Sequence, residues 1–317
     1  MIAALGAFDG FHKGHQALFK VAEKLARAGR DSWSAITFSP HPRAVLGETP
    51  FPCLFSEKEK DIMADMFDIP EIHRITFTRA FAEMRTEEFA AFLEERLFVR
   101  GVVVGEDFRF GKGRSGDAVS LGSIAFEKGW TYAVAPTVKI RGSKVSSSSI
   151  RLSVESGDVE GAAEALGYPF FMTGRVIKGD GRGSGIGFPT ANLQTHHDRA
   201  IPARGVYAGG AFVRGRLRPA AINVGFNPTF EGKRGLRVEA HIPDFSLNLH
   251  EENIALVFLA RTRSEKRFSD VSALVERLAI DVDEAKEAWS RFYDANLRFM
   301  DRMEKSLRKG LERRHPA

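Results

Sequence analysis

The feature that most constrains this chain is a change of periodicity near residue 167. Before it, short apolar runs such as residues 2–8 and 101–105 alternate with longer segments that repeat apolar residues every three or four positions. Short continuous apolar runs predict strands buried on both faces, and the longer repeats predict amphipathic helices. We therefore expect the first half to form a doubly wound α/β domain with a parallel, Rossmann-like sheet.

The second half carries short β-type runs separated by turn residues. They cover residues 174–178, 206–213, 220–224, 236–242 and 254–260. Many short strands with regular turns are typical of a small antiparallel β-barrel or sandwich. Two helical patterns follow, the first over about residues 270–278 and the second over 285–307. We therefore expect two domains, 1–167 and 168–317, the second being a small antiparallel β-barrel with C-terminal helices.

Composition limits the class of protein. Of the 317 residues, 43% are hydrophobic and 27% are charged, which is typical of a globular protein. No apolar run reaches the roughly 18 residues of a membrane span, and residues 1–5 lack the features of a secretion signal. The single cysteine, Cys53, excludes an internal disulfide. We expect a cytoplasmic protein with no membrane partner.

The net charge of +5 favours anionic ligands such as phosphates. The densest basic stretch, residues 302–314, is expected to be the solvated face of a terminal helix. Basic and aromatic residues are not interleaved on one face, so we expect no nucleic-acid partner. Nothing in the sequence indicates an oligomeric state.

The most informative segment is residues 6–15, between a predicted strand and a predicted helix. The N-terminus of a helix stabilises phosphate through its unpaired N–H groups and partial positive charge. His12 and His15 are three residues apart and can face the same point, while Gly10 and Gly14 allow a close backbone approach. Two imidazoles there could donate hydrogen bonds to a transferring phosphoryl group. The alternatives are a surface or capping role, or a zinc site, for which no third ligand is nearby.

This segment resembles a known family. His12-Lys13-Gly14-His15 resembles the His-x-Gly-His signature of the nucleotidyltransferase superfamily, and residues 8–15 resemble the N-terminal module of bacterial bifunctional riboflavin kinase/FAD synthetases. Residues 37–42, 104–111 and 145–151 resemble three further segments in order. The resemblance implies ATP binding by Gly6, Phe8, Asp9, Gly10 and Gly14, catalytic contacts from His12, His15 and Arg151, phosphate binding by Ser146 and Ser147, and flavin binding by His41, Asp107 and Phe108.

Two of these assignments have a basis in the residues themselves. Hydroxyl groups at a helix start, followed by an arginine, form a plausible oxyanion cradle, although a serine run is also typical of a linker. His41 stands between two prolines and could equally belong to a rigid turn.

A second candidate site is the glycine-rich segment 179–192. Glycines permit a close approach to phosphate, but no Walker A lysine follows, and a surface hairpin loop is the alternative. Thr190 and Asn192 are two apart, so on a strand both side chains point to the same side. A hydroxyl and an amide oxygen are suitable ligands for Mg²⁺.

Residues 187–192 match the riboflavin kinase motif Gly-Phe-Pro-Thr-Ala-Asn at every position. The resemblance implies that Thr190 and Asn192 bind Mg²⁺ and ATP, with Gly179 and Gly187 in the phosphate-binding segment. Residues 205–208, 223–230 and 238–241 also fit. Residues 263–268 resemble the family's Arg-x-Glu-x-x-Phe, in which Glu265 would be the general base. Without the family, Glu265 would be expected in a surface ion pair.

The combined resemblance implies two activities. The second domain would phosphorylate riboflavin with ATP to give FMN, and the first would transfer an adenylyl group from ATP to FMN, giving FAD and pyrophosphate. Mg²⁺ would be the cofactor and ATP the co-substrate. A flavin-binding regulator without catalysis would be expected to have damaged phosphate motifs, which are intact here. A nicotinamide-nucleotide or phosphopantetheine adenylyltransferase would leave the barrel without a role.

Overall fold

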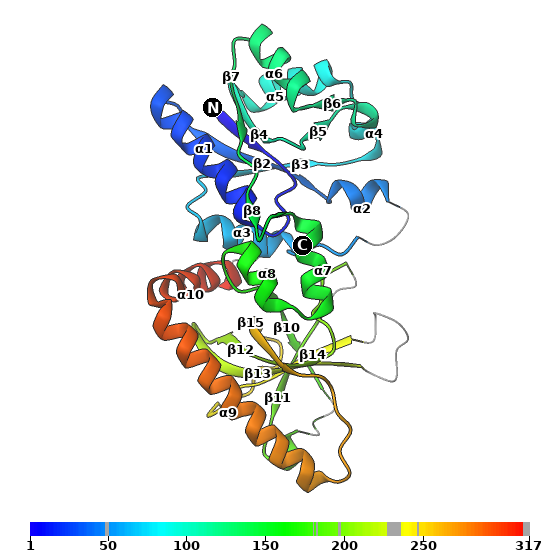
Figure 1. The fold of residues 1–317 in the computed structure, drawn as a ribbon, viewed down its shortest axis with the longest axis vertical. Coiled ribbons are helices and arrows are strands. Elements are labelled where there is room, and N and C mark those ends of the chain that lie inside the picture. Colours follow the sequence, from blue (N-terminus) through cyan, green and yellow to red (C-terminus); the bar gives the residue numbers. More distant parts are fainter. Residues whose placement is uncertain are drawn as a thin grey trace. The chain divides into compact units, whose positions relative to one another are not determined.

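A computed structural model describes residues 1–47, 51–179, 181, 183–195, 198–226, 236–245 and 247–312. The chain forms two compact units. The first comprises Met1–Cys53 and Met63–Ser147, and the second comprises Leu54–Ile62 and Ser148–Ala317. Each unit is described by itself below (Figure 1).

The first unit is built on a five-stranded parallel sheet with the strand order β3-β2-β1-β4-β7. Its central strands, β1 (Ile2–Leu5) and β4 (Gly101–Gly105), are the most apolar runs of this half and are almost wholly buried. The chain passes from β1 to β2 and β3 on one side, then returns to β4 and β7 on the other. The strand order therefore reverses between β1 and β4, where doubly wound sheets bind ligands.

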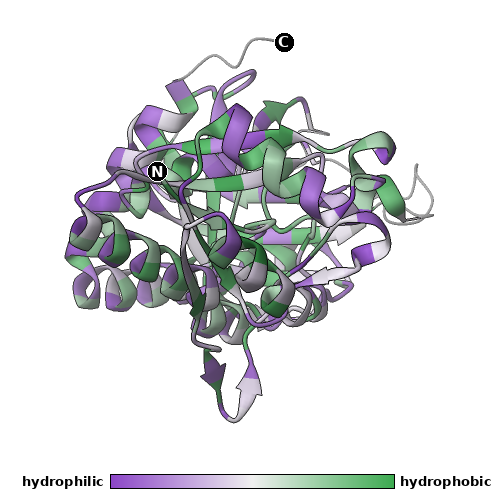
Figure 2. Cartoon of the chain, turned by 90° about the horizontal axis from the view of Figure 1, so that it is seen from above, coloured by the Kyte–Doolittle hydropathy of each residue, from purple (hydrophilic) through white to green (hydrophobic). Residues whose placement is uncertain are grey.

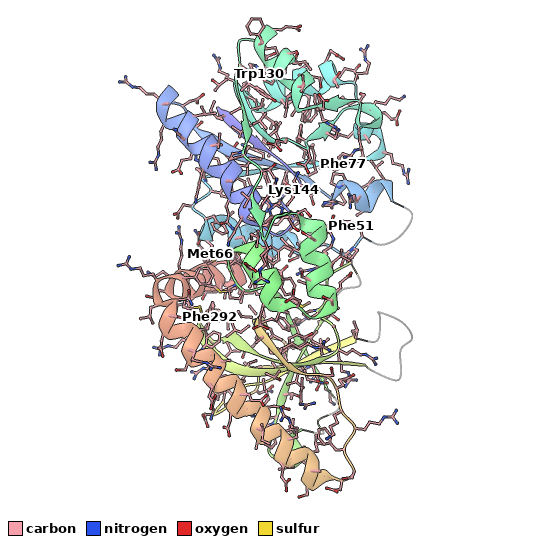
Figure 3. The ribbon with its side chains drawn as sticks, viewed as in Figure 1. Phe51, Met66, Phe77, Trp130, Lys144 and Phe292 are labelled. Atoms are coloured by element: carbon pink, nitrogen blue, oxygen red, sulfur yellow. The ribbon has the colours of Figure 1, made fainter. Side chains whose placement is uncertain are left out.

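Helices cover this sheet (Figure 1). The core between the layers is rich in aromatic residues. Trp130, labelled in Figure 3, belongs to this core. The remaining elements of the unit are α1 (Lys13–Gly29), β2 (Trp33–Ser39), α2 (Pro42–Leu46), β3 (Ile72–Thr76), α4 (Arg79–Ala82), α5 (Thr86–Leu97), β5 (Arg109–Phe110), η1 (Lys112–Arg114), β6 (Gly116–Asp117), α6 (Ala118–Glu127), β7 (Thr131–Ala135), β8 (Lys139–Ile140) and β9 (Ser143–Lys144).

The second unit contains a closed antiparallel barrel with the order β10-β11-β14-β13-β12-β15. A closed barrel leaves no strand edge unpaired, which suits a small all-β core. Gly210 has no side chain, and a Cβ there would overlap the ring of Trp289, so helix α9 packs directly on β12. The strands are β10 (Phe171–Ile177), β11 (Thr190–Leu193), β12 (Gly205–Val213), β13 (Arg216–Phe226), β14 (Leu236–His241) and β15 (Asn253–Arg263), with η2 (Ser184–Ile186) before β11 and helices α7 (Ser147–Ser156) and α8 (Val159–Leu166) before β10.

The C-terminal helices differ from the sequence prediction in their boundary. Helix α9 (Val271–Ala295) continues through the break expected between residues 278 and 285, because Asp281, Val282 and Ala285 extend its buried face. The break falls at Asn296, whose side chain donates to the carbonyl of Phe292. Helix α10 (Leu297–Glu312) then follows. Figure 2 shows hydrophilic and hydrophobic residues together along the helices of the chain, as expected of amphipathic elements.

The second unit also includes residues 54–62, at the start of α3 (Glu57–Met66). Glu59 is fully buried there. Its carboxylate accepts hydrogen bonds from the backbone N–H and the hydroxyl of Thr173 and forms an ion pair with Arg199. Contacts thus group residues 148–167 and this segment with the barrel, and the functional boundary at 167/168 stays a prediction. Within the part of the chain that the structure describes, no helix is both long and apolar enough for a membrane span.

Candidate active sites

The loop from β1 to α1 forms the first candidate site, at the point where the strand order reverses. Gly6 is required there, because a Cβ would lie 2.7 Å from the ring of Phe8. Phe8, Gly10 and Phe11 all have positive φ angles, so the loop turns tightly before the helix. The side chain of Phe8 is buried in the core and meets the edge of the His15 ring, with centroids 5.2 Å apart. Its contribution to the site is therefore to support that histidine.

The structure brings His12 and His15 together at the N-terminus of α1. Their rings are stacked, with centroids 3.6 Å apart, and Nδ1 of His12 accepts a hydrogen bond from the backbone N–H of His15 at 3.3 Å. Neutral His12 must therefore carry its proton on Nε2. Burial is the main cause that lowers the pKa of His12 to about 4. At neutral pH His12 is an uncharged hydrogen-bond donor beside a helix N-terminus.

The predicted phosphate-binding serines lie beside this loop. The hydroxyl of Ser147, the last residue of the first unit, donates to the carbonyl of Asp9 at 2.7 Å, and Ser146 is the preceding residue. A Cβ at Gly14 would lie 3.1 Å from the ring of His12. Arg151 stands one turn further along α7, in the second unit; it is buried, and its guanidinium donates to Ser148 at 3.2 Å.

Asp107 and Lys144, the second of which is labelled in Figure 3, act electrostatically on His12. Asp107 follows β4, and its carboxylate forms an ion pair with the ammonium of Lys144 at 2.9 Å. Burial opposes ionisation of Asp107, but the hydrogen bond and charge of Lys144 leave its pKa below the ordinary value. Phe108 packs on the ring of Phe110, with centroids 5.7 Å apart.

An aromatic cavity of about 550 Å³ lies in the same unit. Phe51 and Phe77, labelled in Figure 3, are two of its walls. His41 caps α2 by accepting from the N–H of Arg43 at 3.1 Å, and its ring stacks on Phe51. Sequence reasoning missed this cavity, because its phenylalanines come from separate segments. The lining includes Phe38, Pro42, Arg43, Leu46, Phe51, Phe77, Phe81, Met84, Phe89, Arg109 and Phe110.

The second candidate site is on the barrel, around Thr190 and Asn192 of β11. Gly187 has φ 86° and ends the short helix η2 just before this strand. A Cβ at Gly179 would overlap the side-chain amide of Asn192, so only glycine fits. Asn192 is 6% exposed, and within the described residues its Oδ1 has no hydrogen-bond partner. A buried oxygen without a donor is a suitable ligand for a cation.

Strand register extends this site into a polar row. Asn192 on β11 stands opposite Glu239 on β14, which in turn stands opposite Asn223 on β13. Side chains at opposed positions share a face of the sheet. Glu265 approaches the end of the row, with Oε1 2.8 Å from where a Cβ of Gly225 would be. Glu239 is a candidate functional residue that sequence reasoning missed, because only the pairing of distant strands places it beside Asn192.

Two cavities of about 320 Å³ each meet at Thr190. The first contains polar groups at one end and apolar side chains from α9 at the other, with the lining Phe188, Thr190, Asn223, Glu239, His241, Arg263, Glu265, Phe268, Leu274, Leu278 and Val282 among others. The second is formed mainly by the glycine-rich segment and its surroundings, including Lys178, Gly179, Ser184, Thr190, Leu247 and Leu249. Thr190 thus stands at the junction between an amphipathic pocket and a second, more polar one.

Comparison with known proteins finds a matching family for each half of the chain. Residues 1–149 match the FAD synthetase family, and residues 166–289 match the riboflavin kinase family. A bifunctional riboflavin kinase/FMN adenylyltransferase from Listeria monocytogenes is 32% identical over 92% of this chain and 94% of its own length. The chain belongs to this family. The Bacillus subtilis member is 33% identical over 90% of this chain and 91% of its own length.

Membership of the riboflavin kinase/FMN adenylyltransferase family confirms the two-activity prediction and the enzyme class. A crystal structure of the macrolide-efflux protein from Streptococcus pneumoniae has the same fold, with a TM-score of 0.81 and 31% identity over 90% of this chain and 93% of that one. The predicted fold class is therefore confirmed as well. The histidine pair lies in the FAD synthetase match, Thr190 and Asn192 lie in the riboflavin kinase match, and helix α10 follows both.

Proposed function

We propose that the barrel transfers the γ-phosphoryl group of ATP to the 5′-hydroxyl of riboflavin, and that the parallel-sheet unit then joins FMN to AMP. The observation that carries this proposal is the meeting of two cavities at Thr190, beside the buried Oδ1 of Asn192. A kinase needs such a junction, because its two substrates must present their reacting atoms to each other there.

The two cavities differ in ways that suit different substrates. Phe268, Leu274 and Leu278 provide an apolar wall for the isoalloxazine ring system in the first. Lys178 and Gly179 in the second suit the phosphates of ATP, since an ammonium and exposed backbone N–H groups both bind anions. In this arrangement the 5′-hydroxyl oxygen bonds to the γ-phosphorus, the bond to the β-phosphate oxygen breaks, and ADP leaves.

The residues around Asn192 fit Mg²⁺. Thr190 and Asn192 offer a hydroxyl and an amide oxygen, which are hard ligands suited to Mg²⁺, and the Asn192 oxygen is already desolvated. Mg²⁺, when bound, offsets phosphate charge. The proposed task of these two residues is to orient the phosphates relative to the hydroxyl.

Two carboxylates can receive the hydroxyl proton. Glu265 is the residue implied by the family resemblance, but its side chain is 39% exposed and stands 3.9 Å from Arg204. Glu239 is in register with Asn192, and its carboxylate forms an ion pair with Arg237 at 3.5 Å. We propose that Glu265 accepts the proton, as the family resemblance implies, because Glu239 lies nearer to a cation than Glu265 does and is the weaker base for it. Glu265→Gln should then lower kcat more than Glu239→Gln does; the reverse pattern would make Glu239 the base.

In the adenylyl transfer, an oxygen of the FMN phosphate bonds to the α-phosphorus of ATP, and the bond to the β-phosphate breaks to release pyrophosphate. The proposed role of His12 and His15 is to donate hydrogen bonds to phosphate oxygens that gain charge. Ser146, Ser147 and Arg151 would hold the triphosphate. The aromatic cavity suits the flavin of FMN, with His41, Asp107 and Phe108 in neighbouring segments.

The direct test is to incubate purified protein with riboflavin, ATP and Mg²⁺ and to separate the flavins by chromatography. His15→Ala should allow FMN to accumulate without FAD. Asn192→Ala should stop FMN formation, while supplied FMN should still become FAD. Loss of both steps in either folded variant would contradict two separate sites, and a wild-type protein that binds flavin without turnover would instead be a regulator.

The proposal extends to the protein's surroundings. We place the enzyme in the cytoplasm, where ATP is abundant and a single free thiol such as Cys53 stays reduced. Its partners would be riboflavin, FMN and ATP, and no nucleic acid or membrane is required.

A further inference from the structure

A buried carboxylate on α9 organises a set of charges beside the riboflavin kinase cavity. Asp281 is 1% exposed. Its two oxygens accept from Nε and Nη2 of Arg263 at 2.9 and 2.6 Å, and Oδ1 also accepts from Nε of Arg277 at 2.9 Å. The proposed function gives Asp281 no role, although both it and Arg263 line the cavity that contains Thr190.

Arg263 connects this carboxylate to the loop that carries Glu265. It is the last residue of β15, and its Nη1 donates to the carbonyl of Ser264 at 3.1 Å. Its guanidinium also stands 5.8 Å from the ring centre of Phe268. One side chain therefore contacts the loop backbone just before Glu265 and a ring just after it.

The planar guanidinium makes this connection directional. Two parallel hydrogen bonds from Nε and Nη2 to one carboxylate fix both the position and the rotation of the Arg263 guanidinium. A buried ion pair is a weak source of stability, since desolvation offsets most of its attraction. The packing of Trp289 against Gly210 already holds α9 on the barrel. The main effect of a carboxylate at position 281 is thus to orient the guanidinium of Arg263, more than to stabilise the fold.

We infer that Asp281 is a positioning residue for riboflavin phosphorylation: by orienting Arg263, it sets the loop that presents Glu265 and Phe268 to the flavin substrate. This inference rests on the proposed kinase function of the barrel. In that proposal ATP occupies the other cavity. Asp281 should therefore affect the binding and reaction of riboflavin and not the binding of ATP.

The test is Asp281→Asn, which keeps the shape but removes the charge. We expect kcat for riboflavin phosphorylation to fall about 10- to 100-fold, the range in which small misplacements of reacting groups act, with a raised KM for riboflavin. KM for ATP should stay within about twofold, because the phosphate-binding residues are untouched. The matched control is Arg277→Gln, which removes the other cation at Asp281 but leaves the pair with Arg263; it should keep both constants.

A double-mutant cycle with Glu265→Gln separates positioning from general damage. If Asp281 acts through the loop, the two substitutions should together cost clearly less than the product of their separate costs. Fully multiplicative losses, or an equal rise in both KM values, would overturn the inference.

Two further readouts complete the design. If Asp281→Asn does not fold, Arg263→Lys tests the same link, because it keeps the positive charge but loses the paired guanidinium donors. It should raise KM for riboflavin and leave KM for ATP unchanged. An equal rise in the two KM values would overturn the inference. Absence of riboflavin phosphorylation by the wild-type protein would instead refute the proposed function, so the two failures are distinct.

Discussion

Acidification is expected to destabilise the first unit through His12. The side chain is 6% exposed, and its Nδ1 already accepts the N–H of His15, so the folded protein has little space for a second ring proton. Burial lowers the pKa of His12 from 6.5 to about 4. The unfolded chain therefore binds this proton first as the pH falls. The stabilising contribution is complete above a pH of about 6.5 and is lost between about 6.5 and 4.

The magnitude follows from the two pKa values. The difference between 6.5 in the unfolded chain and about 4 in the folded one corresponds to about 3 kcal/mol once the pH is below both. At about pH 5 the side chain is almost fully protonated in the unfolded chain and still mostly neutral in the folded one. The free energy of unfolding has then already fallen by about 2 kcal/mol. That is a large part of the 5–15 kcal/mol by which domains are typically stable.

His12→Asn is the matched control, because asparagine also caps helices well but cannot titrate in this range. Hydrogen exchange of the α1 amides at about pH 7 and 5, corrected for the intrinsic rates, reads the opening free energy of this unit alone. The wild-type protein should lose about 2 kcal/mol more than the variant between the two pH values. Equal losses, or an NMR titration of His12 near its ordinary pKa, would refute the assignment of a desolvated neutral imidazole.

Three further outcomes follow from the same structure. Glu59→Gln should destabilise the barrel unit by about 3–5 kcal/mol in urea unfolding, because it leaves the buried Arg199 without its counter-charge; a loss under about 1 kcal/mol would show that the pair is dispensable. Gly179→Ala should stop riboflavin phosphorylation by displacing Asn192, whereas Gly185→Ala meets no described atom within 4 Å and should be tolerated. Chelation of Mg²⁺ should halt both reactions in a flavin assay, with recovery on adding excess Mg²⁺, and undiminished turnover would exclude the cation.

The parts of both sites that could be predicted from sequence are those whose geometry spans a few residues. His12 and His15 are placed together by one helical turn, and the strand before them is recognisable from its apolar run. Thr190 and Asn192 share a face because strand side chains alternate. In each case local backbone geometry is sufficient, and no distant contact is needed.

The parts that could not be predicted depend on which distant segments meet. Glu239 comes next to Asn192 only because β14 pairs with β11 in one register, and a shift of one residue would turn it to the other face. Residues 54–62 belong with the barrel because a buried charge, Glu59, finds its partner at Arg199. The two helical patterns were separated between residues 278 and 285, but Asp281 lies there on the buried face of α9, where a distant residue, Arg263, neutralises its charge.

The glycines near both sites have a second role that the sequence pattern alone does not reveal. The glycines of segments 6–15 and 179–192 suggested a close approach of phosphate, but in the structure Gly14 and Gly179 make room for protein side chains, as does Gly225. The missing Cβ of Gly14 faces the ring of His12, that of Gly179 faces the amide of Asn192, and that of Gly225 faces the carboxylate of Glu265. Each polar group can therefore lie against backbone, where its position is restricted by contacts that do not involve substrate. Phosphoryl transfer depends mainly on such positioning, so substitutions at these glycines should act on kcat through the neighbouring polar group even where they leave room for the phosphates.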